Sequence, residues 1–228
     1  MTNKTPARPC VALSPYSDEL AEGMAALGIE PTAERLSRLL AFGELLLKWN
    51  RAYNLTAIRE PKEIITRHLL DSLTVWPWAK SLRTLADIGS GAGFPGIPLA
   101  IVCPSLTVHS IEAVGKKAGF QQQAKIELWL NNLNVMQRRA ETVRPAELPD
   151  GGVEAVISRA FSSLADFVRL AGGLVAENGA LYAMKGAPSE AEIAALPAGW
   201  RIEARHCLSI PNCGDARHLL VVRRSLLA

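Results

Sequence analysis

The fold is decided by the stretch Leu85-Ala-Asp-Ile-Gly-Ser-Gly-Ala-Gly-Phe-Pro-Gly-Ile-Pro98. An apolar run ends in Asp87, breaks into glycines, and continues at Pro95 with residues typical of a helix start. This order predicts a strand, a tight loop and a helix. Because glycines have no Cβ, the backbone N–H groups of the loop and the helix N-terminus can approach a ligand closely. A nucleotide-like ligand is therefore favoured over a purely structural turn.

Two ligand classes fit the glycine spacing. Starting at Gly91, the loop matches G-x-G-x-x-G, which predicts a nicotinamide-dependent oxidoreductase with Glu112 on the ribose. Starting at Asp87, the loop is D-x-G-x-G-x-G, which resembles the first motif of the Rossmann-like methyltransferases that bind S-adenosylmethionine. The second interpretation is favoured because the Asp87 carboxylate, on the strand side of the glycines, can face a cationic amino-acid group.

The composition predicts one α/β domain, since 228 residues with 49% hydrophobic content can bury a large core. Charged residues interrupt every apolar stretch well short of a membrane span, and the first ten residues lack the apolar centre of a secretion signal. The four cysteines form no close pair, which indicates free thiols and a cytoplasmic location. The histidines and cysteines near the C-terminus do not have the spacing of a zinc site, so no metal is expected. The net charge of +3 permits a polyanionic partner without requiring one.

Three segments are expected within a single structural domain. They are a disordered tail over residues 1–16, a helical cap packed on the sheet over residues 17–80, and a Rossmann-like core over residues 81–228. From Thr84 onward the predicted strands and helices alternate, which is typical of a parallel sheet with crossover helices. The expected strands cover residues 84–88, 107–111, 135–137, 155–158, 180–184, 201–206 and 218–222. The clearest helices cover residues 114–130 and 163–175, and the last two strands predict a hairpin at one edge of the sheet.

The expected helical cap contains two polar motifs. Residues 48–56 are dense in aromatic, amide and basic side chains, and the charges of the preceding helix are interpreted as a solvated face. In the next helix, His68 and Asp71 are three positions apart and share one helical face. They either line a site or form a satisfied polar pair under a loop. The second interpretation is preferred.

The ends of the strands indicate where a ligand binds, because open α/β sheets bind ligands beyond the carboxyl ends of their strands. The second strand ends at Glu112, which is placed to accept hydrogen bonds from ribose hydroxyls. Residues 138–141 follow the third strand, where a backbone segment and an acid can meet an adenine. Arg159 follows the fourth strand.

The residues around Arg159 limit which kinds of atom can accept a methyl group. They lack the Asp/Asn-Pro-Pro-aromatic motif of enzymes that methylate exocyclic amines, and they lack the cysteine nucleophile that 5-methylpyrimidines require. A ring nitrogen such as guanine N7 has an in-plane lone pair and no proton to lose, so its methylation needs alignment more than a base. An arginine can donate to guanine O6 while N7 stays free. Together with Arg139, Lys185 and Arg217, Arg159 predicts a surface for an anionic substrate.

Six motifs together resemble the bacterial small-subunit ribosomal RNA guanine-N7 methyltransferases, a family also called glucose-inhibited division protein B. The motifs are Leu47-Lys-Trp-Asn-Arg-Ala-Tyr-Asn-Leu-Thr56, Arg67-His-Leu-Leu-Asp-Ser72, Asp87-Ile-Gly-Ser-Gly-Ala-Gly-Phe-Pro-Gly-Ile-Pro98, Ile157-Ser-Arg-Ala-Phe161, Met184-Lys-Gly186 and Arg217-His-Leu219. The resemblance extends roughly from Ser17 to Arg223. It implies a class I Rossmann-like methyltransferase fold with a mostly parallel seven-stranded sheet and an N-terminal helical extension. It also implies S-adenosylmethionine as donor and a guanine of the decoding-region loop of small-subunit (16S) ribosomal RNA as acceptor.

The resemblance also assigns site residues. The expected cofactor contacts are Asp87, Gly89, Ser90, Gly91, Gly93, Phe94, Glu112, Ala140, Glu141 and Arg159. The expected basic residues near the reacting base and its phosphates are Arg139, Arg159, Lys185 and Arg217. The partner is the RNA or the ribosomal particle, no membrane contact is expected, and the protein is expected to be a monomer. The alternatives are the nicotinamide-dependent oxidoreductase and a noncatalytic RNA-binding protein with a methyltransferase-like fold.

Overall fold

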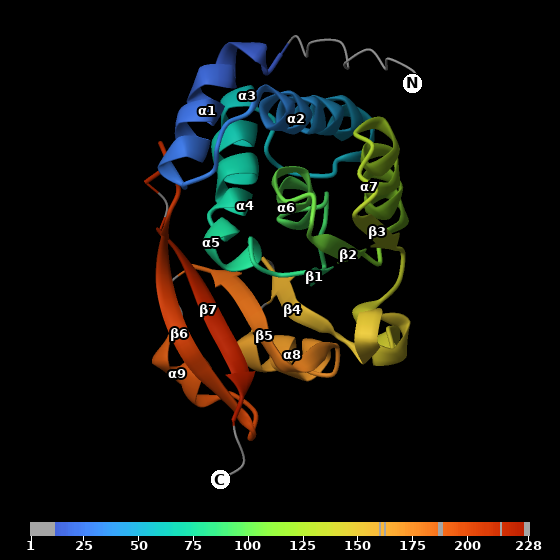
Figure 1. Cartoon of the computed structure of the whole chain (residues 1–228), viewed down its shortest axis with the longest axis vertical. Coiled ribbons are helices and arrows are strands. Elements are labelled where there is room, and N and C mark those ends of the chain that lie inside the picture. Colours follow the sequence, from blue (N-terminus) through green and yellow to red (C-terminus); the bar gives the residue numbers. More distant parts are fainter. Residues whose placement is uncertain (1–11, 160, 162, 187–188, 215, 226–228) are drawn as a thin grey trace.

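A seven-stranded sheet in the order β3-β2-β1-β4-β5-β7-β6 forms the centre of the molecule (Figure 1). The computed structural model describes residues 12–159, 161, 163–186, 189–214 and 216–225. The strands are β1 (Thr84–Ile88), β2 (Thr107–Ile111), β3 (Leu133–Met136), β4 (Val153–Ser158), β5 (Val175–Lys185), β6 (Trp200–Ser209) and β7 (Ala216–Arg224). Strands β1 to β5 pair in parallel, whereas β7 is antiparallel to both β5 and β6. The predicted mostly parallel sheet with a hairpin edge is therefore confirmed.

The helices lie before the sheet in sequence and between its strands. They are η1 (Ser14–Tyr16), α1 (Ser17–Ala26), α2 (Ala33–Tyr53), α3 (Pro61–Glu63), η2 (Ile64–Leu70), α4 (Asp71–Leu73), α5 (Trp76–Ala79), α6 (Gly96–Val102), α7 (Gly115–Glu127), η3 (Ala140–Thr142), η4 (Pro145–Glu147), η5 (Pro149–Gly151), α8 (Leu164–Ala171) and α9 (Glu190–Ala194). Among the residues that the structure describes, no helix combines the length and apolar character needed to cross a membrane.

The bounds of β1 and β2 match the prediction, but the boundary between α8 and β5 does not. The helix expected over residues 163–175 ends at Ala171, and β5 begins at Val175. Gly172 ends the helix at a position where a Cβ would lie 2.7 Å from the ring of Trp200, so only glycine fits the close approach. Val175 then pairs with Val153 of β4, and this tertiary contact extends the strand.

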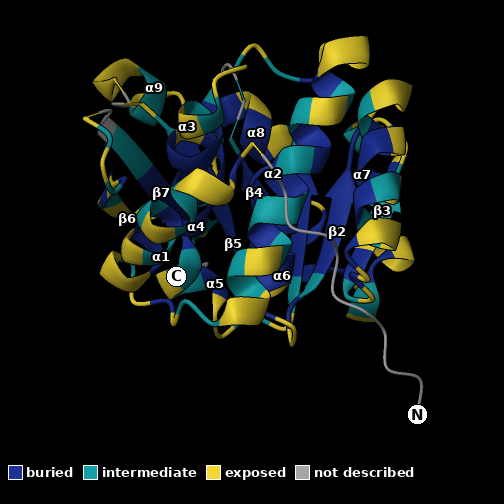
Figure 2. Ribbon diagram, turned by 90° about the horizontal axis from the view of Figure 1, so that it is seen from above, coloured by how far each residue is buried: buried dark blue, intermediate teal, exposed yellow. Residues whose placement is uncertain are grey.

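Two apolar clusters cover the two faces of the sheet. Because side chains alternate along a strand, Ala155 and Ile157 of β4 face one cluster while Val156 faces the other. The first cluster packs α1, α2, η2 and α6 on the sheet, and the second packs α8 on the opposite face. In Figure 2 the central strands are buried, whereas α1, α2 and α7 turn exposed sides outward.

Helix α2 anchors the N-terminal helices to the glycine loop. It begins after Thr32, whose Oγ1 accepts a hydrogen bond from the N–H of Arg35. The buried ring of Phe42 lies with its centroid 5.2 Å from that of Phe94 and 5.9 Å from that of Phe120. The helices before the sheet therefore pack directly on the segment that follows the glycines.

The described structure includes residues before the predicted boundary at residue 17. Most of the predicted tail, residues 1–11, lies outside the described residues. Leu13, however, is fully buried in the first cluster, and η1 begins at Ser14. The Glu44 carboxylate accepts hydrogen bonds from the N–H groups of Ala12 and Leu13, which fixes this entry to α1.

The segment 61–73 is continuous helix, but its middle is wound more widely. Elements α3, η2 and α4 follow one another directly, and η2 is a π-helix. Such π segments are rare and often mark functional sites. Here η2 contains Arg67 and His68 and leads directly into Asp71.

Candidate active site

The glycine loop after β1 forms an open cradle. Gly89 and Gly91 have φ angles of +63° and +60°, and a Cβ on either would meet no atom within 4 Å. Gly93 differs, because a Cβ there would lie 2.4 Å from Cδ1 of Ile97. The backbone of Gly89 and Gly91 is therefore accessible to a ligand, while Gly93 lets α6 pack closely on the loop.

A buried polar cluster holds the loop from behind. The Nε2 group of Gln121 donates to Ser90 Oγ and to the carbonyl of Gly91, both at 2.8 Å. The hydroxyl of Ser110 lies 2.7 Å from Ser90 Oγ. The predicted cofactor residue Ser90 thus uses its side chain to fix the loop and leaves its backbone for a ligand. Ser110 and Gln121 were not predicted, because no sequence motif identifies them.

Glu112 lies beside Gly91, as its position at the end of β2 predicted. Its Oε2 accepts from the N–H of Gly91 and its Oε1 from the N–H of Val114, both at 2.8 Å. The side chain is almost fully buried. Two charge-assisted hydrogen bonds to backbone therefore fix the orientation of this carboxylate next to the cradle.

Asp87 is fully buried beneath the loop. Its Oδ2 accepts a hydrogen bond from the N–H of Gly96 at 2.8 Å, whereas its buried Oδ1 has no hydrogen-bond partner. Burial raises the pKa of Asp87 to about 7, although the bond from Gly96 opposes the shift. A buried acceptor without a partner is costly. A proton or a cationic ligand group at Oδ1 would remove that cost, so the site fits a cofactor with a positive charge.

The residues after β3 lie at some distance from Arg159. Arg139 and Glu141 are exposed and Ala140 is half-buried in η3. Three strand intervals separate β3 from β4, roughly 14 Å at the usual spacing of neighbouring strands. Arg139 and Arg159 therefore follow strands at well-separated positions along the carboxyl edge of the sheet, and their joint role stays a prediction.

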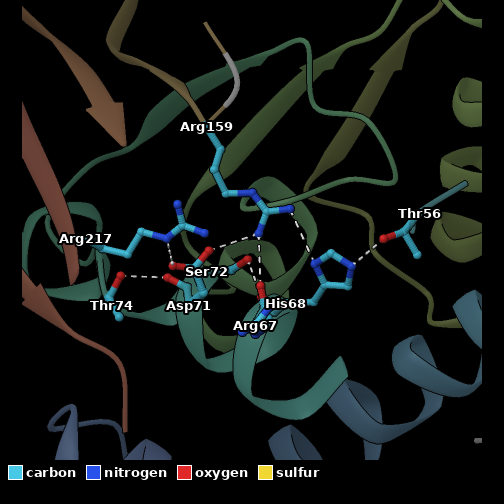
Figure 3. A network of polar contacts seen from close by, with 8 residues as sticks. All are labelled: Thr56, Arg67, His68, Asp71, Ser72, Thr74, Arg159 and Arg217. Atoms are coloured by element: carbon cyan, nitrogen blue, oxygen red, sulfur yellow. Dashed lines mark hydrogen bonds and ion pairs between the residues drawn. The ribbon is translucent and has the colours of Figure 1, made fainter. Parts of the chain in front are cut away.

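Arg159 connects the end of β4 to the π-helix (Figure 3). Its Nη1 lies 3.0 Å from Oδ2 of Asp71, and its Nη2 lies 3.4 Å from Nδ1 of His68. The guanidinium is also 5.3 Å from the ring centroid of Phe94, the residue that follows the glycines. The half-buried guanidinium is thus held between the donor loop and the N-terminal helices.

Asp71 binds a second arginine with its other oxygen. Its Oδ1 lies 3.4 Å from Nε of Arg217, at the start of β7, and the aspartate side chain is fully buried. Lys185 pairs with Glu192 of α9, and its register opposite His218 places it at the same edge of the sheet as Arg217. The structure therefore brings Arg159, Lys185 and Arg217 to the ends of neighbouring strands.

The imidazole ring of His68 is neutral and contacts the guanidinium of Arg159. It stacks on Phe94 with centroids 4.4 Å apart, and its Nε2 lies 2.8 Å from Thr56 Oγ1. Burial, followed by the positive charge of Arg159, lowers the pKa of His68 to about 3. Because an arginine only donates, Nδ1 accepts and the ring proton belongs on Nε2.

The preferred sequence interpretation of His68 and Asp71, a polar pair under a loop, misses their common partner. The two side chains meet through Arg159, a residue on the far side of the glycine motif in sequence. Their spacing of three positions was visible in the sequence. The link to Arg159 depends on the tertiary fold and has no local signal.

A sequence model of the family described as rRNA small subunit methyltransferase G matches residues 35–221. This chain belongs to that family.

Curated relatives extend the match over nearly the whole chain. The ribosomal RNA small subunit methyltransferase G of Azoarcus sp. (strain BH72) is 60% identical, with 93% of this chain and 98% of that protein aligned. The protein of the same name from Aromatoleum aromaticum is 50% identical over 90% of this chain and 98% of its own length. The resemblance inferred from the six motifs is therefore confirmed.

Solved structures support the fold at low sequence identity. A SAM dependent methyltransferase from Aquifex aeolicus is similar with a TM-score of 0.55 and 19% identity, over 74% of this chain and 96% of that one. The tRNA methyltransferase TrmK of B. subtilis has a TM-score of 0.54 and 13% identity, over 68% of this chain and 65% of that one. The predicted Rossmann-like methyltransferase fold is confirmed.

Proposed function

We propose that this protein transfers the methyl group of S-adenosylmethionine to N7 of a guanine in small-subunit (16S) ribosomal RNA. Family membership supports the rRNA methyltransferase activity. The observation that supports the ring nitrogen as acceptor is Arg159, which Asp71 holds over Phe94 next to the donor loop. An acceptor that must be oriented but not deprotonated suits a site organised around arginines.

The donor would lie on the open backbone of Gly89 and Gly91. Glu112 is fixed beside this backbone and would accept hydrogen bonds from the ribose hydroxyls. The unpartnered Oδ1 of Asp87 would face the cationic amino-acid end. When bound, S-adenosylmethionine supplies an electrophilic methyl group on a positively charged sulfur. Ala140 and Glu141, which follow β3, would line the adenine side.

The acceptor guanine would be aligned by Arg159. Its planar guanidinium can donate to guanine O6 and leave N7 directed at the methyl group. No proton leaves N7 during the reaction, so His68, whose Nδ1 faces Arg159, acts in positioning and not as a general base. Arg217 and Lys185 would bind the phosphates near the reacting base. Arg139, at the opposite side of the cradle, would bind a more distant phosphate. The protein would act in the cytoplasm as a monomer.

Two titrations and a transfer assay test this function. Calorimetry should detect binding of S-adenosylmethionine and no binding of NADH, and the reverse result would restore the oxidoreductase alternative. Unmethylated small ribosomal subunits should incorporate label from methyl-tritiated S-adenosylmethionine. Arg159→Lys should bind the donor normally but reduce kcat by roughly ten- to a hundredfold, since lysine keeps the charge and loses the planar fork. Donor binding without any methyl transfer would support the noncatalytic alternative.

A further inference from the structure

A basic hollow lies on the N-terminal helices, outside the donor and acceptor sites. Its volume is about 360 Å³, and Lys48 and Arg51 of α2 and Arg59 of the following loop contribute its cationic lining. The three side chains belong to exposed residues. The region corresponds to the motif dense in aromatic, amide and basic side chains, to which the proposed chemistry assigns no role.

Within the described part of the chain the basic hollow has an excess of positive charge, because three cations and one acid line it. There, the side chains of Lys48 and Arg51 have no hydrogen-bond or ion-pair partner, and Arg59 donates only to the neutral amide oxygen of Asn54. The acid that lines the hollow, Glu44, already accepts from two backbone N–H groups. Exposed arginines elsewhere do pair with carboxylates, as in Arg38–Glu34, Arg83–Glu154 and Arg169–Asp166.

The sequence that precedes the hollow does not supply the missing negative charge. Ala12 lies at its rim, and residues 1–11 include Lys4 and Arg8 but no acidic residue. A cluster of unpaired cations around a concavity attracts polyanions. An external anionic ligand is therefore the natural occupant.

A chain of contacts links the basic hollow to the proposed acceptor site. Asn50 lines the hollow, and its amide donates to the carbonyl of Ile58 and accepts from the N–H of Thr56. Thr56 in turn contacts His68, which contacts Arg159. One short loop therefore separates the hollow from the residues proposed to align the guanine.

We infer that the basic hollow binds the phosphodiester backbone of the substrate RNA next to the nucleotide that is methylated. This inference rests on the proposed function. Lys48, Arg51 and Arg59 would each neutralise a phosphate, and such contacts position an RNA without reading its sequence. The hollow adds affinity for the substrate and takes no part in methyl transfer itself.

The test compares Lys48→Gln/Arg51→Gln/Arg59→Gln with a control that removes cations elsewhere. Lys80→Gln/Lys125→Gln serves as control, because Lys80 precedes β1 and Lys125 lies near the end of α7, both at the amino-end edge of the sheet. The probes are unmethylated small ribosomal subunits in a methyl-transfer assay and protein-free 16S rRNA in fluorescence anisotropy. The affinity for S-adenosylmethionine, measured by calorimetry, reports on folding. Lys48→Glu alone provides a second variant in which one charge is reversed.

The triple variant should raise KM for the particles and Kd for the free RNA by roughly ten- to a hundredfold, with kcat and donor affinity retained. The slope of log Kd against log salt concentration should fall by about 2, since three single-strand phosphate contacts are lost. Lys48→Glu should shift KM and Kd in the same direction, and the control should match the wild type.

An unchanged KM, Kd and salt slope would overturn the inference. A raised KM on particles with unchanged affinity for free rRNA would also overturn it and identify an acidic ribosomal protein as the occupant. Failure of the wild type to methylate the particles would instead refute the proposed function.

Discussion

The guanidinium of Arg159 lies 3.0 Å from the carboxylate of Asp71, although 88 positions separate the two residues in the chain. The other carboxylate oxygen of Asp71, Oδ1, lies 3.4 Å from Nε of Arg217. One buried acid from the N-terminal helices thus orients two arginines at the carboxyl edge of the sheet. The helical extension and the sheet therefore complete one site together.

Replacing the carboxylate of Asp71 should loosen both arginines. Asp71→Asn keeps the size of the side chain but loses its charge, which should cost roughly 2–3 kcal/mol of unfolding free energy. The value of kcat should fall by about tenfold or more, with donor affinity unchanged, because the arginines and not the cradle are affected. The control is Asp166→Asn, which breaks an exposed pair with Arg169 and should leave stability and activity close to those of the wild type. If both variants were as active as the wild type, Asp71 would have no role in orienting the arginines of the site.

Removing the carboxylate of Glu112 should weaken the binding of S-adenosylmethionine and leave RNA binding unchanged. Glu112→Ala leaves the ribose hydroxyls and the N–H of Gly91 without a charged acceptor, a loss of about 1.5–3 kcal/mol. Calorimetry should therefore show a rise of roughly ten- to a hundredfold in Kd for S-adenosylmethionine. Glu177→Ala, which removes an exposed carboxylate on β5, should leave Kd unchanged. If Glu112→Ala lost affinity for RNA and kept its affinity for the donor, Glu112 would contact the RNA and not S-adenosylmethionine.

Binding of the donor should release a proton from Asp87. Burial raises the pKa of this carboxyl to about 7, so near pH 7 about half of the free protein is protonated there. A cationic ligand group beside Oδ1 favours the ionised form of Asp87 over the protonated form, so the carboxyl group releases its proton when the donor binds. The release should approach one proton at pH 6 and vanish by about pH 8. Calorimetry in buffers with different ionisation enthalpies measures it, and Asp87→Asn should abolish it. Binding heats that do not depend on the buffer would contradict a cationic partner for Asp87.

The neutral state of His68 makes the fold sensitive to acid. Its pKa falls from 6.5 to about 3 on folding, so between these values the unfolded chain binds a proton that the folded chain does not. Stability therefore falls as pH decreases through this window and is independent of His68 above it. Between pH 7 and pH 5 the wild type should lose about 2 kcal/mol more than His68→Gln, as measured by urea unfolding. Parallel losses in the two proteins would show that His68 titrates normally.

Local sequence patterns predicted the parts of the molecule that depend on neighbouring residues. Strands β1 and β2 were bounded correctly because each is a short run ending at a polar loop. The boundary between α8 and β5 was wrong because pairing of Val175 with Val153 extends the strand. The grouping of Arg139 with Arg159 stays a prediction, because it depends on strand order, which no local pattern encodes.

The supporting contacts of the site were the least predictable part. Gln121 reaches the glycine loop from α7, and Asp71 reaches Arg159 from the first residue of α4, directly after the π-helix. Both are ordinary polar residues in sequence, and their partners lie 31 and 88 positions away. Only the packing of helices on the sheet brings them together.

Mass spectrometry of 16S rRNA, digested both to nucleosides and to oligonucleotides, is the most direct test of the proposed chemistry. Unmethylated small ribosomal subunits would be incubated with the purified protein and S-adenosylmethionine that contains a deuterated methyl group. We expect deuterated 7-methylguanosine at one position of the RNA, formed by the wild type and almost lost with Arg159→Ala. Label on a pyrimidine carbon or an exocyclic amine, or full activity of Arg159→Ala, would contradict it.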